Sequence, residues 1–390
     1  MSRKPKKVKA HSLTGRINPE MMFRAFRNVK QNRGAAGVDK VSIQMFEANL
    51  EHNLDRLMRQ LKDGTYQPQP LRRAYVPKSD GRQRPLGIPA VRDRVAQDVL
   101  RQLLNPVFEP LFHRCSFGFR SGRNCHLAVV EILTLWREGY RYVVDADITG
   151  FFDNIPHHVI LGAVAAEVAD GNVLRLVQKI LTAGVMEDGA FRPTQIGTPQ
   201  GGVISPLLAN IVLNHLDWKL HEARYYFVRY ADDFVVLAKS PQAAEEALRF
   251  VDRVLVDELG LQLNQQKTMV TSFRNGFAFL GFVISSHSVK MSSKAVGRFK
   301  DKVRAITVRN HNLDAQVIVK LNRIIRGTAN YFLAPFTAST MLARDLDRWV
   351  RMRLRAMKFK RKWRTDHFRL RCRYLKKMGL LAFEELCSAA

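Results

Sequence analysis

Two apolar segments flank a pair of adjacent acids in the middle of the chain, and this arrangement restricts the fold more than any other feature. The segments are 226–230 and 234–238, and Asp232 and Asp233 lie between them. Aspartate is a poor strand residue but is well suited to turns. The pattern therefore predicts a β-hairpin with both acids at its tip. Taken alone, the two acids are explained equally well by turn chemistry and by function.

A third acid, Asp147, ends another predicted strand, 140–147, in which Val143, Asp145 and Asp147 share one face. Carboxylates at neighbouring strand ends can converge, and without a cation they would repel each other. Oxygen ligands alone favour a hard ion such as Mg²⁺. Two such ions, about 4 Å apart, stabilise the attacking and the leaving oxygen in phosphoryl transfer. The sequence therefore predicts polymerase chemistry at Asp147, Asp232 and Asp233.

The charge of the chain points to a polyanionic partner. Its 390 residues include 63 Lys and Arg against 35 Asp and Glu, a net charge of +28. Basic proteins gain binding free energy from nucleic acid because each neutralised phosphate releases a condensed counterion. The alternative is a basic surface that is merely solvated.

Cysteine usage and hydropathy exclude several other classes. The four cysteines form no C-x-x-C pair, so that neither a zinc site nor a disulfide framework is expected, and a reducing compartment fits. The longest apolar run near a motif, 277–284, is far shorter than the ~18 residues that a membrane helix needs. We therefore expect no membrane partner.

Strands and helices are mixed along most of the chain, and only helices are predicted after residue 294. One of the earlier helices is expected to begin at Ser205-Pro206, with Ser205 as its N-cap. No internal repeat or long linker separates the two regions. This order predicts an α+β catalytic body followed by a helical C-terminal domain.

Several motifs resemble those of group II intron-encoded reverse transcriptases. Tyr230-Ala231-Asp232-Asp233 is similar to the Tyr-x-Asp-Asp signature of that family. Further resemblances are found in segments 32–39, 84–89, 116–123, 147–153, 197–210, 264–268 and 279–282. A lone Tyr-x-Asp-Asp is weak evidence, but these motifs follow one another in the family's order over roughly residues 15–380.

The resemblance implies a right-hand polymerase fold with fingers, palm and thumb, closed by a basic helical C-terminal domain. It divides the chain into a basic disordered arm over 1–16, fingers over 17–135 and a palm over 136–290. Residues 291–390 would form the thumb and a maturase-like RNA-binding domain.

The resemblance also implies roles at the acidic site. Asp147 and Asp232 would hold two Mg²⁺ ions, for which Mn²⁺ could substitute, together with the backbone carbonyl of Ile148. Asp233 would support them. Two flanking acids, Asp145 and Asp153, are expected to be structural.

Another set of residues would bind the incoming dNTP and the template. Lys78 and Arg84 would clamp the triphosphate, and Phe152 would pack under the sugar and exclude a 2′-hydroxyl. Gln200 and Gly201 would line the nucleotide and the template, since a glycine permits close backbone approach. The alternatives are loop charges for the cations and an ordinary core position for Phe152.

The C-terminal third carries a basic stripe that is predicted to lie along one helix and to bind nucleic acid. Its members are Arg344, Arg348, Arg351, Arg355, Lys358 and Lys362. Interleaved aromatic residues, among them Trp349 and Trp363, could be core or could stack on bases. Thr328 stands where the family pattern has tryptophan, which leaves splicing assistance open.

The resemblance thus implies an RNA-directed DNA polymerase that adds dNTPs to a primer 3′-hydroxyl. Its partners would be an RNA template, such as a structured intron RNA, and a DNA primer or target. The protein would be of the endonuclease-lacking type, would assist splicing and retrohoming, and would work in the bacterial cytoplasm or nucleoid. Two alternatives remain: a domesticated relative in defence, repair or CRISPR adaptation, and an RNA-binding splicing cofactor with an idle polymerase site.

Overall fold

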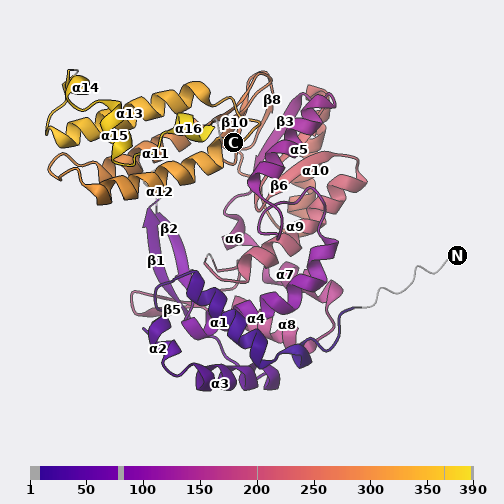
Figure 1. Ribbon diagram of the computed structural model, residues 1–390. Coiled ribbons are helices and arrows are strands. Elements are labelled where there is room, and N and C mark those ends of the chain that lie inside the picture. Colours follow the sequence, from indigo (N-terminus) through magenta and orange to yellow (C-terminus); the bar gives the residue numbers. More distant parts are fainter. Residues whose placement is uncertain (1–8, 78–82, 200, 364, 388–390) are drawn as a thin grey trace. The chain divides into compact units, whose positions relative to one another are not determined.

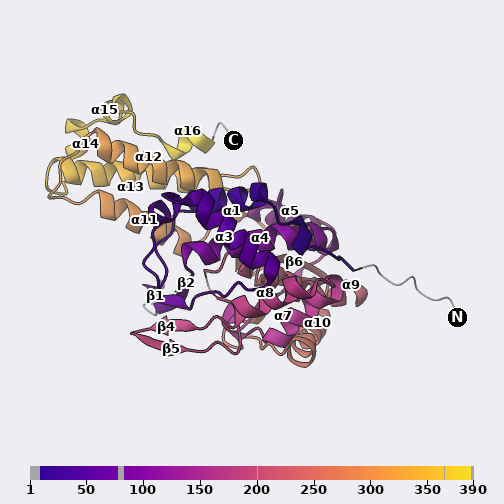
Figure 2. The ribbon, with the colours of Figure 1, turned by 90° about the horizontal axis from the view of Figure 1, so that it is seen from below.

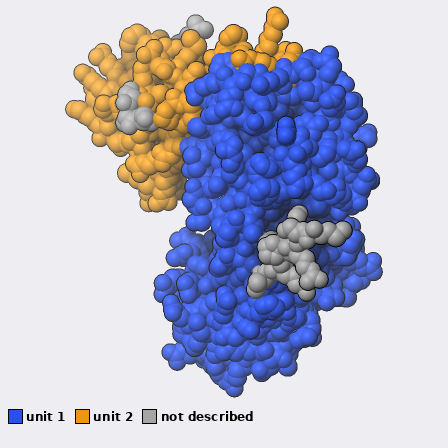
Figure 3. Space-filling view, turned by 90° about the vertical axis from the view of Figure 1, so that its right-hand side faces the viewer, with its two compact units in different colours: residues 1–140, 144–270 blue, residues 141–143, 271–390 orange. Residues whose placement is uncertain are grey.

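The structure is a computed structural model that describes residues 9–77, 83–199, 201–363 and 365–387 (Figure 1). The chain divides into two compact units, coloured separately in Figure 3. Unit 1 comprises residues 1–140 and 144–270, and unit 2 comprises residues 141–143 and 271–390. Within the described ranges, the structure contains no helix with the length and hydropathy of a membrane span.

The N-terminal half of unit 1 is a helical layer around α4, Val91–Phe108. Helix α1, Pro19–Gln31, begins where the side chain of Asn18 accepts a hydrogen bond from the backbone of Met21, and it packs on α4 (Figure 2). The other helices of this half are α2 Ile43–Glu47, α3 Leu50–Asp63, α5 Cys125–Arg137 and the 3₁₀ turns η1 Thr14–Arg16 and η2 Glu109–Leu111.

A four-stranded sheet in the order β2-β1-β4-β5 follows the first helices. Its strands are β1 Leu71–Pro77, β2 Gln83–Ile88, β4 Val185–Glu187 and β5 Ala190–Arg192. The first two are antiparallel, and Arg84 of β2 lies opposite Val76 of β1. The turn between them, which contains Lys78, lies outside the described residues.

A second four-stranded sheet, in the order β6-β7-β3-β8, carries the acids. Its strands are β3 Tyr142–Asp147, β6 Tyr226–Tyr230, β7 Asp233–Ala238 and β8 Met269–Ser272. Helix α5 packs on β6, and α10, Pro241–Arg253, packs on β7 (Figure 1). The remaining helices of unit 1 are α6 Phe151–Asn154, α7 His157–Glu167, α8 Gly171–Leu181, α9 Ser205–Glu222 and the π-helix η3 Val254–Glu258.

Unit 2 combines a small sheet with a helical bundle. The sheet has the order β11-β10-β9, with β9 Phe277–Phe279, β10 Phe282–Ile284 and β11 Val289–Met291. The helices are α11 Ser293–Ile306, α12 Ala315–Phe332, α13 Thr340–Lys358, α14 Asp366–Arg369, α15 Cys372–Lys377 and α16 Phe383–Cys387. One apolar core, which includes Phe299, Leu321 and Leu354, joins α11, α12, α13, α15 and α16. The predicted helical C-terminal third is confirmed.

Two local expectations were wrong. Ser205 is the first residue of α9 rather than its N-cap, because its hydroxyl is engaged by the preceding loop. That hydroxyl donates to the carbonyl of Pro199 at 2.8 Å and accepts from Thr198 at 2.7 Å. The expected disordered arm over 1–16 is also too long, since Leu13 is fully buried and Ala10 forms a β-bridge with Val168.

Candidate active site

The hairpin formed by β6 and β7 presents Asp232 in its turn. Tyr230 pairs with Asp233, so that only Ala231 and Asp232 form the loop between the strands. Ala231 has φ of 60°, in the left-handed region that a residue with a Cβ seldom adopts. The prediction that both acids occupy the tip was therefore half right, because Asp233 is the first residue of β7.

A buried ion pair holds this hairpin from behind. Arg229 on β6 and Asp217 on α9 are both fully buried, with Nε to Oδ1 at 2.7 Å and Nη2 to Oδ2 at 2.5 Å. Nη1 of Arg229 also donates to Asn210 Oδ1 at 2.8 Å and to the carbonyl of Ala231 at 2.9 Å. The second of these bonds fixes the turn beside Asp232.

Residues 115–118 brace the other edge of the hairpin. The amide of Phe117 donates to the carbonyl of Arg229 at 2.8 Å, and the amide of Arg229 donates to the carbonyl of Cys115 at 2.9 Å. Gly118 lies so close to the turn that a Cβ there would be 2.3 Å from the backbone nitrogen of Ala231. Only glycine therefore fits at this position without moving the turn.

Asp147 is the last residue of β3, and its carboxylate forms an ion pair with a lysine. Its Oδ2 accepts from the ammonium group of Lys267 at 2.9 Å, and its backbone amide donates to Thr268 Oγ1 at 3.3 Å. The amide of Asn264 donates to the Asp147 carbonyl at 2.7 Å. The segment 264–268 thus positions Asp147 and supplies a positive charge at its carboxylate.

The acids affect one another electrostatically. Burial, and then the negative charge of Asp147, raise the pKa of Asp232 above its ordinary value, although its own backbone hydrogen bond and the guanidinium groups of Arg84 and Arg229 oppose this rise. Burial and Asp147 also raise the pKa of Asp145 to about 6. Carboxylates that disfavour each other's ionisation are suited to a cation between them. Arg84 and Asp147 are therefore both within electrostatic reach of Asp232.

The oxygen atoms that could hold a cation at this site are carboxylate oxygens and one backbone carbonyl oxygen. Among the residues that the structure describes, no three His, Cys, Asp or Glu side chains gather as a metal cage. Ile148 and Leu263 form an antiparallel β-bridge, whose hydrogen bonds join Thr149 to Gln262 and Asn264 to Asp147. The carbonyl of Ile148 therefore takes no part in these hydrogen bonds. Asp147, Asp232 and this carbonyl offer oxygen ligands of the kind that Mg²⁺ prefers.

The substrate-binding candidates are brought into the same unit. Gly201 has φ of 109°, and a Cβ there would be 2.9 Å from the carbonyl oxygen of Gly87 on β2. Phe152 is half-buried on α6, and its carbonyl accepts from the amide of Thr198 at 2.7 Å. Arg84 is exposed on β2. Gln200, like Lys78, lies outside the described residues.

Comparison with known proteins decides the family. A family model described as reverse transcriptase (RNA-dependent DNA polymerase) matches residues 76–284, more than half of the chain. The chain belongs to the reverse transcriptase family. A second family model, described as the maturase-specific domain of group II introns, matches residues 296–376 of this reverse transcriptase homologue.

Individual proteins and one solved structure are also similar to the chain. Protein YkfC of Escherichia coli is 37% identical over 303 residues, which are 67% of this chain and 80% of that protein. The group II intron-encoded protein LtrA of Lactococcus lactis is 28% identical, over 81% of this chain and 69% of that protein. A telomerase structure from Candida albicans matches 86% of this chain and 66% of its own, at 13% identity and a TM-score of 0.44. The two family models make the chain a reverse transcriptase and maturase homologue, and its fold is that of a right-hand polymerase.

The basic stripe of the maturase-specific domain is less uniform than the sequence suggested. Arg344 pairs with Glu384 at 2.8 Å, and Arg348 lies 3.7 Å from Asp345. Arg355 is half-buried and donates from Nε to the carbonyl of Leu370 at 3.0 Å, which ties α13 to the segment after it.

The end of the stripe also differs from the prediction. Helix α13 ends at Lys358, and Lys360 has φ of 56°. The expectation that Lys362 continues the helical stripe was therefore wrong. Arg351 is half-buried, whereas Lys358 and Lys362 are exposed.

Sequence reasoning missed three residues that support this candidate site. Lys267 lies inside a motif that was recognised, but its pairing with Asp147, 120 residues away in the sequence, left no local signal. Arg229 was detectable as a lone charge in an apolar strand, which is an expensive position unless the charge is paired. Its partner Asp217 could not be chosen from the sequence, because nothing local connects the two residues.

Proposed function

We propose that the chain catalyses RNA-templated DNA synthesis at a site built on Asp147 and Asp232. The observation that carries this proposal is that β3, which ends at Asp147, lies next to β7, which begins directly after Asp232, in one hydrogen-bonded sheet. The primer 3′-hydroxyl would attack the α-phosphate of a dNTP, and pyrophosphate would leave. The family membership of residues 76–284 supports the same reaction.

Asp147, Asp232 and the carbonyl of Ile148 would hold Mg²⁺, and Asp233 would support them from β7. Bound Mg²⁺ would stabilise the charge that develops on the reacting phosphate. Lys267 would hold the carboxylate of Asp147 in position, since the two groups are 2.9 Å apart.

Four further side chains would bind the substrates. Arg84 and Lys78 would contact the triphosphate, because fixed cations stabilise the charge on a transferring phosphoryl group. Phe152 would pack under the sugar, and Gln200 with Gly201 would line the nucleotide and the template. The placement of Gly201 beside Gly87 supports a close approach of this segment to β2.

The C-terminal unit would bind RNA. Lys358 and Lys362 are exposed, and they would contact phosphates directly. Arg344 and Arg348 would need to leave their acidic neighbours first, and Arg355 would act by holding the fold. The match of residues 296–376 to the maturase-specific domain supports intron RNA as the ligand and splicing assistance as the outcome.

The direct test is dNTP incorporation on a poly(rA)/oligo(dT) template–primer with Mg²⁺, and then with Mn²⁺. We expect Asp147→Asn and Asp232→Asn to abolish incorporation and to leave RNA binding intact, because each removes a negatively charged metal ligand. Asp252→Asn is the matched control, since Asp252 is an exposed acid on α10 of the same unit. A folded, RNA-binding wild type without any incorporation would refute the proposal and favour the splicing-cofactor alternative.

A further inference from the structure

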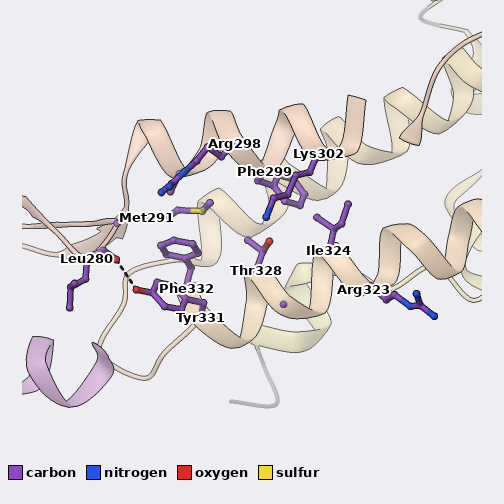
Figure 4. Close-up of a pocket in the computed structure, with 13 residues that line it drawn as sticks. Leu280, Met291, Arg298, Phe299, Lys302, Arg323, Ile324, Thr328, Tyr331 and Phe332 are labelled. Atoms are coloured by element: carbon purple, nitrogen blue, oxygen red, sulfur yellow. Dashed lines mark hydrogen bonds between the residues drawn. The ribbon is translucent and has the colours of Figure 1, made fainter. Parts of the chain in front are cut away.

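Unit 2 contains a groove of about 790 Å³ between α11 and α12 (Figure 4). Each helix contributes residues that are three, four and seven positions apart and therefore lie on one face. On α11 these are Ala295, Arg298, Phe299 and Lys302, and on α12 they are Ile324, Gly327, Thr328 and Tyr331. The volume falls within the range of small-molecule sites.

The groove is basic at its rim. Arg298 and Lys302, both exposed, extend from α11 toward the α12 side, one helical turn apart (Figure 4). The lining also includes Arg323, and none of the described residues that line the groove is acidic. Charge complementarity therefore favours an anion with more than one phosphate within reach.

The floor of the groove is apolar and aromatic. Phe299 is buried in the core, whereas Tyr331 and Phe332 are half-buried and lie edge-to-face with their ring centroids 4.6 Å apart. Thr328 places a small side chain with a hydroxyl group between Phe332 and Ile324 (Figure 4). Phosphate-binding cations above an aromatic floor, with one hydroxyl that can bond a base edge, match the chemistry of an unpaired nucleotide.

We propose that this groove binds an unpaired nucleotide of single-stranded RNA, with its base on Tyr331 and Phe332 and its phosphates at Arg298 and Lys302. Bases in a duplex are stacked on each other and cannot enter such a slot, whereas unpaired bases can. Thr328 is the specificity-determining position, because a large side chain there fills the space that the base occupies. The inference rests on the RNA binding proposed for unit 2 and adds a site for one unpaired nucleotide. It is tested by binding alone, so that the proposed polymerase reaction and this site can fail independently.

The experiment compares the affinities of the full chain for a fluorescent single-stranded oligouridylate and for a blunt RNA hairpin. We expect Thr328→Trp to weaken oligouridylate binding about tenfold, which is about 1.4 kcal/mol, and to leave hairpin binding unchanged. Val319→Trp is the matched control, because Val319 is an exposed residue of α12 outside the groove. Equal affinities of wild type and Thr328→Trp for the oligouridylate would overturn the proposal.

A second variant keeps the proposal testable if Thr328→Trp does not fold. Arg298→Ala/Lys302→Ala should reduce the salt dependence of oligouridylate binding by a slope of about 1.4, since each phosphate contact on a single strand contributes about 0.7. Arg326→Ala, an exposed cation of α12 outside the groove, should not change the slope. An equal reduction of the slope in Arg326→Ala would overturn the assignment of the phosphates to Arg298 and Lys302.

Free uridine 5′-monophosphate tests whether the groove binds a nucleotide within an RNA strand or a free nucleotide. The proposal expects 4-thiouridine in the oligonucleotide to crosslink to the peptide that contains Tyr331 and Phe332, and expects the crosslink to be lost in Thr328→Trp. Binding of the free monophosphate that depends on Thr328, without such a crosslink, would overturn the assignment to a strand and make the groove a nucleotide site.

Discussion

A methyl group added at Gly118 should displace the β6–β7 hairpin and slow nucleotide addition. A Cβ at this position would be 2.3 Å from the nitrogen of Ala231, 2.9 Å from the carbonyl carbon of Tyr230 and 3.1 Å from the Ala231 Cα. All three atoms belong to backbone, which cannot rotate away as a side chain can. The turn must therefore retreat by about 1 Å to restore ordinary contact distances.

This displacement has a kinetic cost that can be estimated. A misplacement of about 1 Å in a reacting group can lower the rate about 100-fold, which is about 2.7 kcal/mol of activation free energy. We expect Gly118→Ala to show this loss in single-turnover incorporation of one dNTP at saturating concentration. Affinity for the template–primer should stay near that of wild type, because the change does not touch the basic surface of unit 2.

Gly162→Ala is the matched control for Gly118→Ala. Gly162 lies in α7, and a Cβ there would meet no atom within 4 Å. Alanine should leave the rate unchanged and stabilise the helix by up to about 1 kcal/mol. Wild-type kcat in a folded Gly118→Ala protein would refute the reasoning, since it would mean that the position of the turn does not control the reaction.

Three further predictions concern the charges around the site. Lys267→Met removes the ammonium group that lies 2.9 Å from Asp147. Because both side chains are largely exposed, the variant without metal should lose less than about 1 kcal/mol of stability. Adding Mg²⁺ should raise its Tm by more than it raises the Tm of wild type, and an equal rise would contradict this. Asp217→Asn leaves the fully buried Arg229 without its carboxylate and should lower the free energy of unfolding in urea by roughly 3–5 kcal/mol, whereas a loss near zero would show that the pair is not needed. Burial, and then His221, lower the pKa of His113 to about 4. The unfolded chain takes up this proton near pH 6.5 and the folded chain only near pH 4, so that stability should fall by about 3 kcal/mol as the pH drops through this window. In His113→Gln, the free energy of unfolding measured over the same pH range should not show this loss. A pH dependence equal to that of wild type would disprove the role of His113.

Local pattern was sufficient for most of the secondary structure. Apolar segments before Asp147 and on both sides of Asp232 predicted the strands that carry these acids, and these strands are present. The N-cap at Ser205 failed because a residue's capping role depends on what else its hydroxyl contacts. Thr198 and Pro199 engage that hydroxyl, and no propensity scale includes them.

The sequence by itself determined the family, the α+β order of the elements and the acids on which the proposed chemistry depends. These features are encoded by residues that are close together in the chain, where periodicity and motif order can be read directly. The tertiary structure alone decided which distant groups support them. Gly118 meets Ala231, Arg229 pairs with Asp217, and Lys267 pairs with Asp147. The physical reason is that such contacts arise from packing, in which a glycine or a buried charge is fixed by the shape and polarity of its neighbours in space.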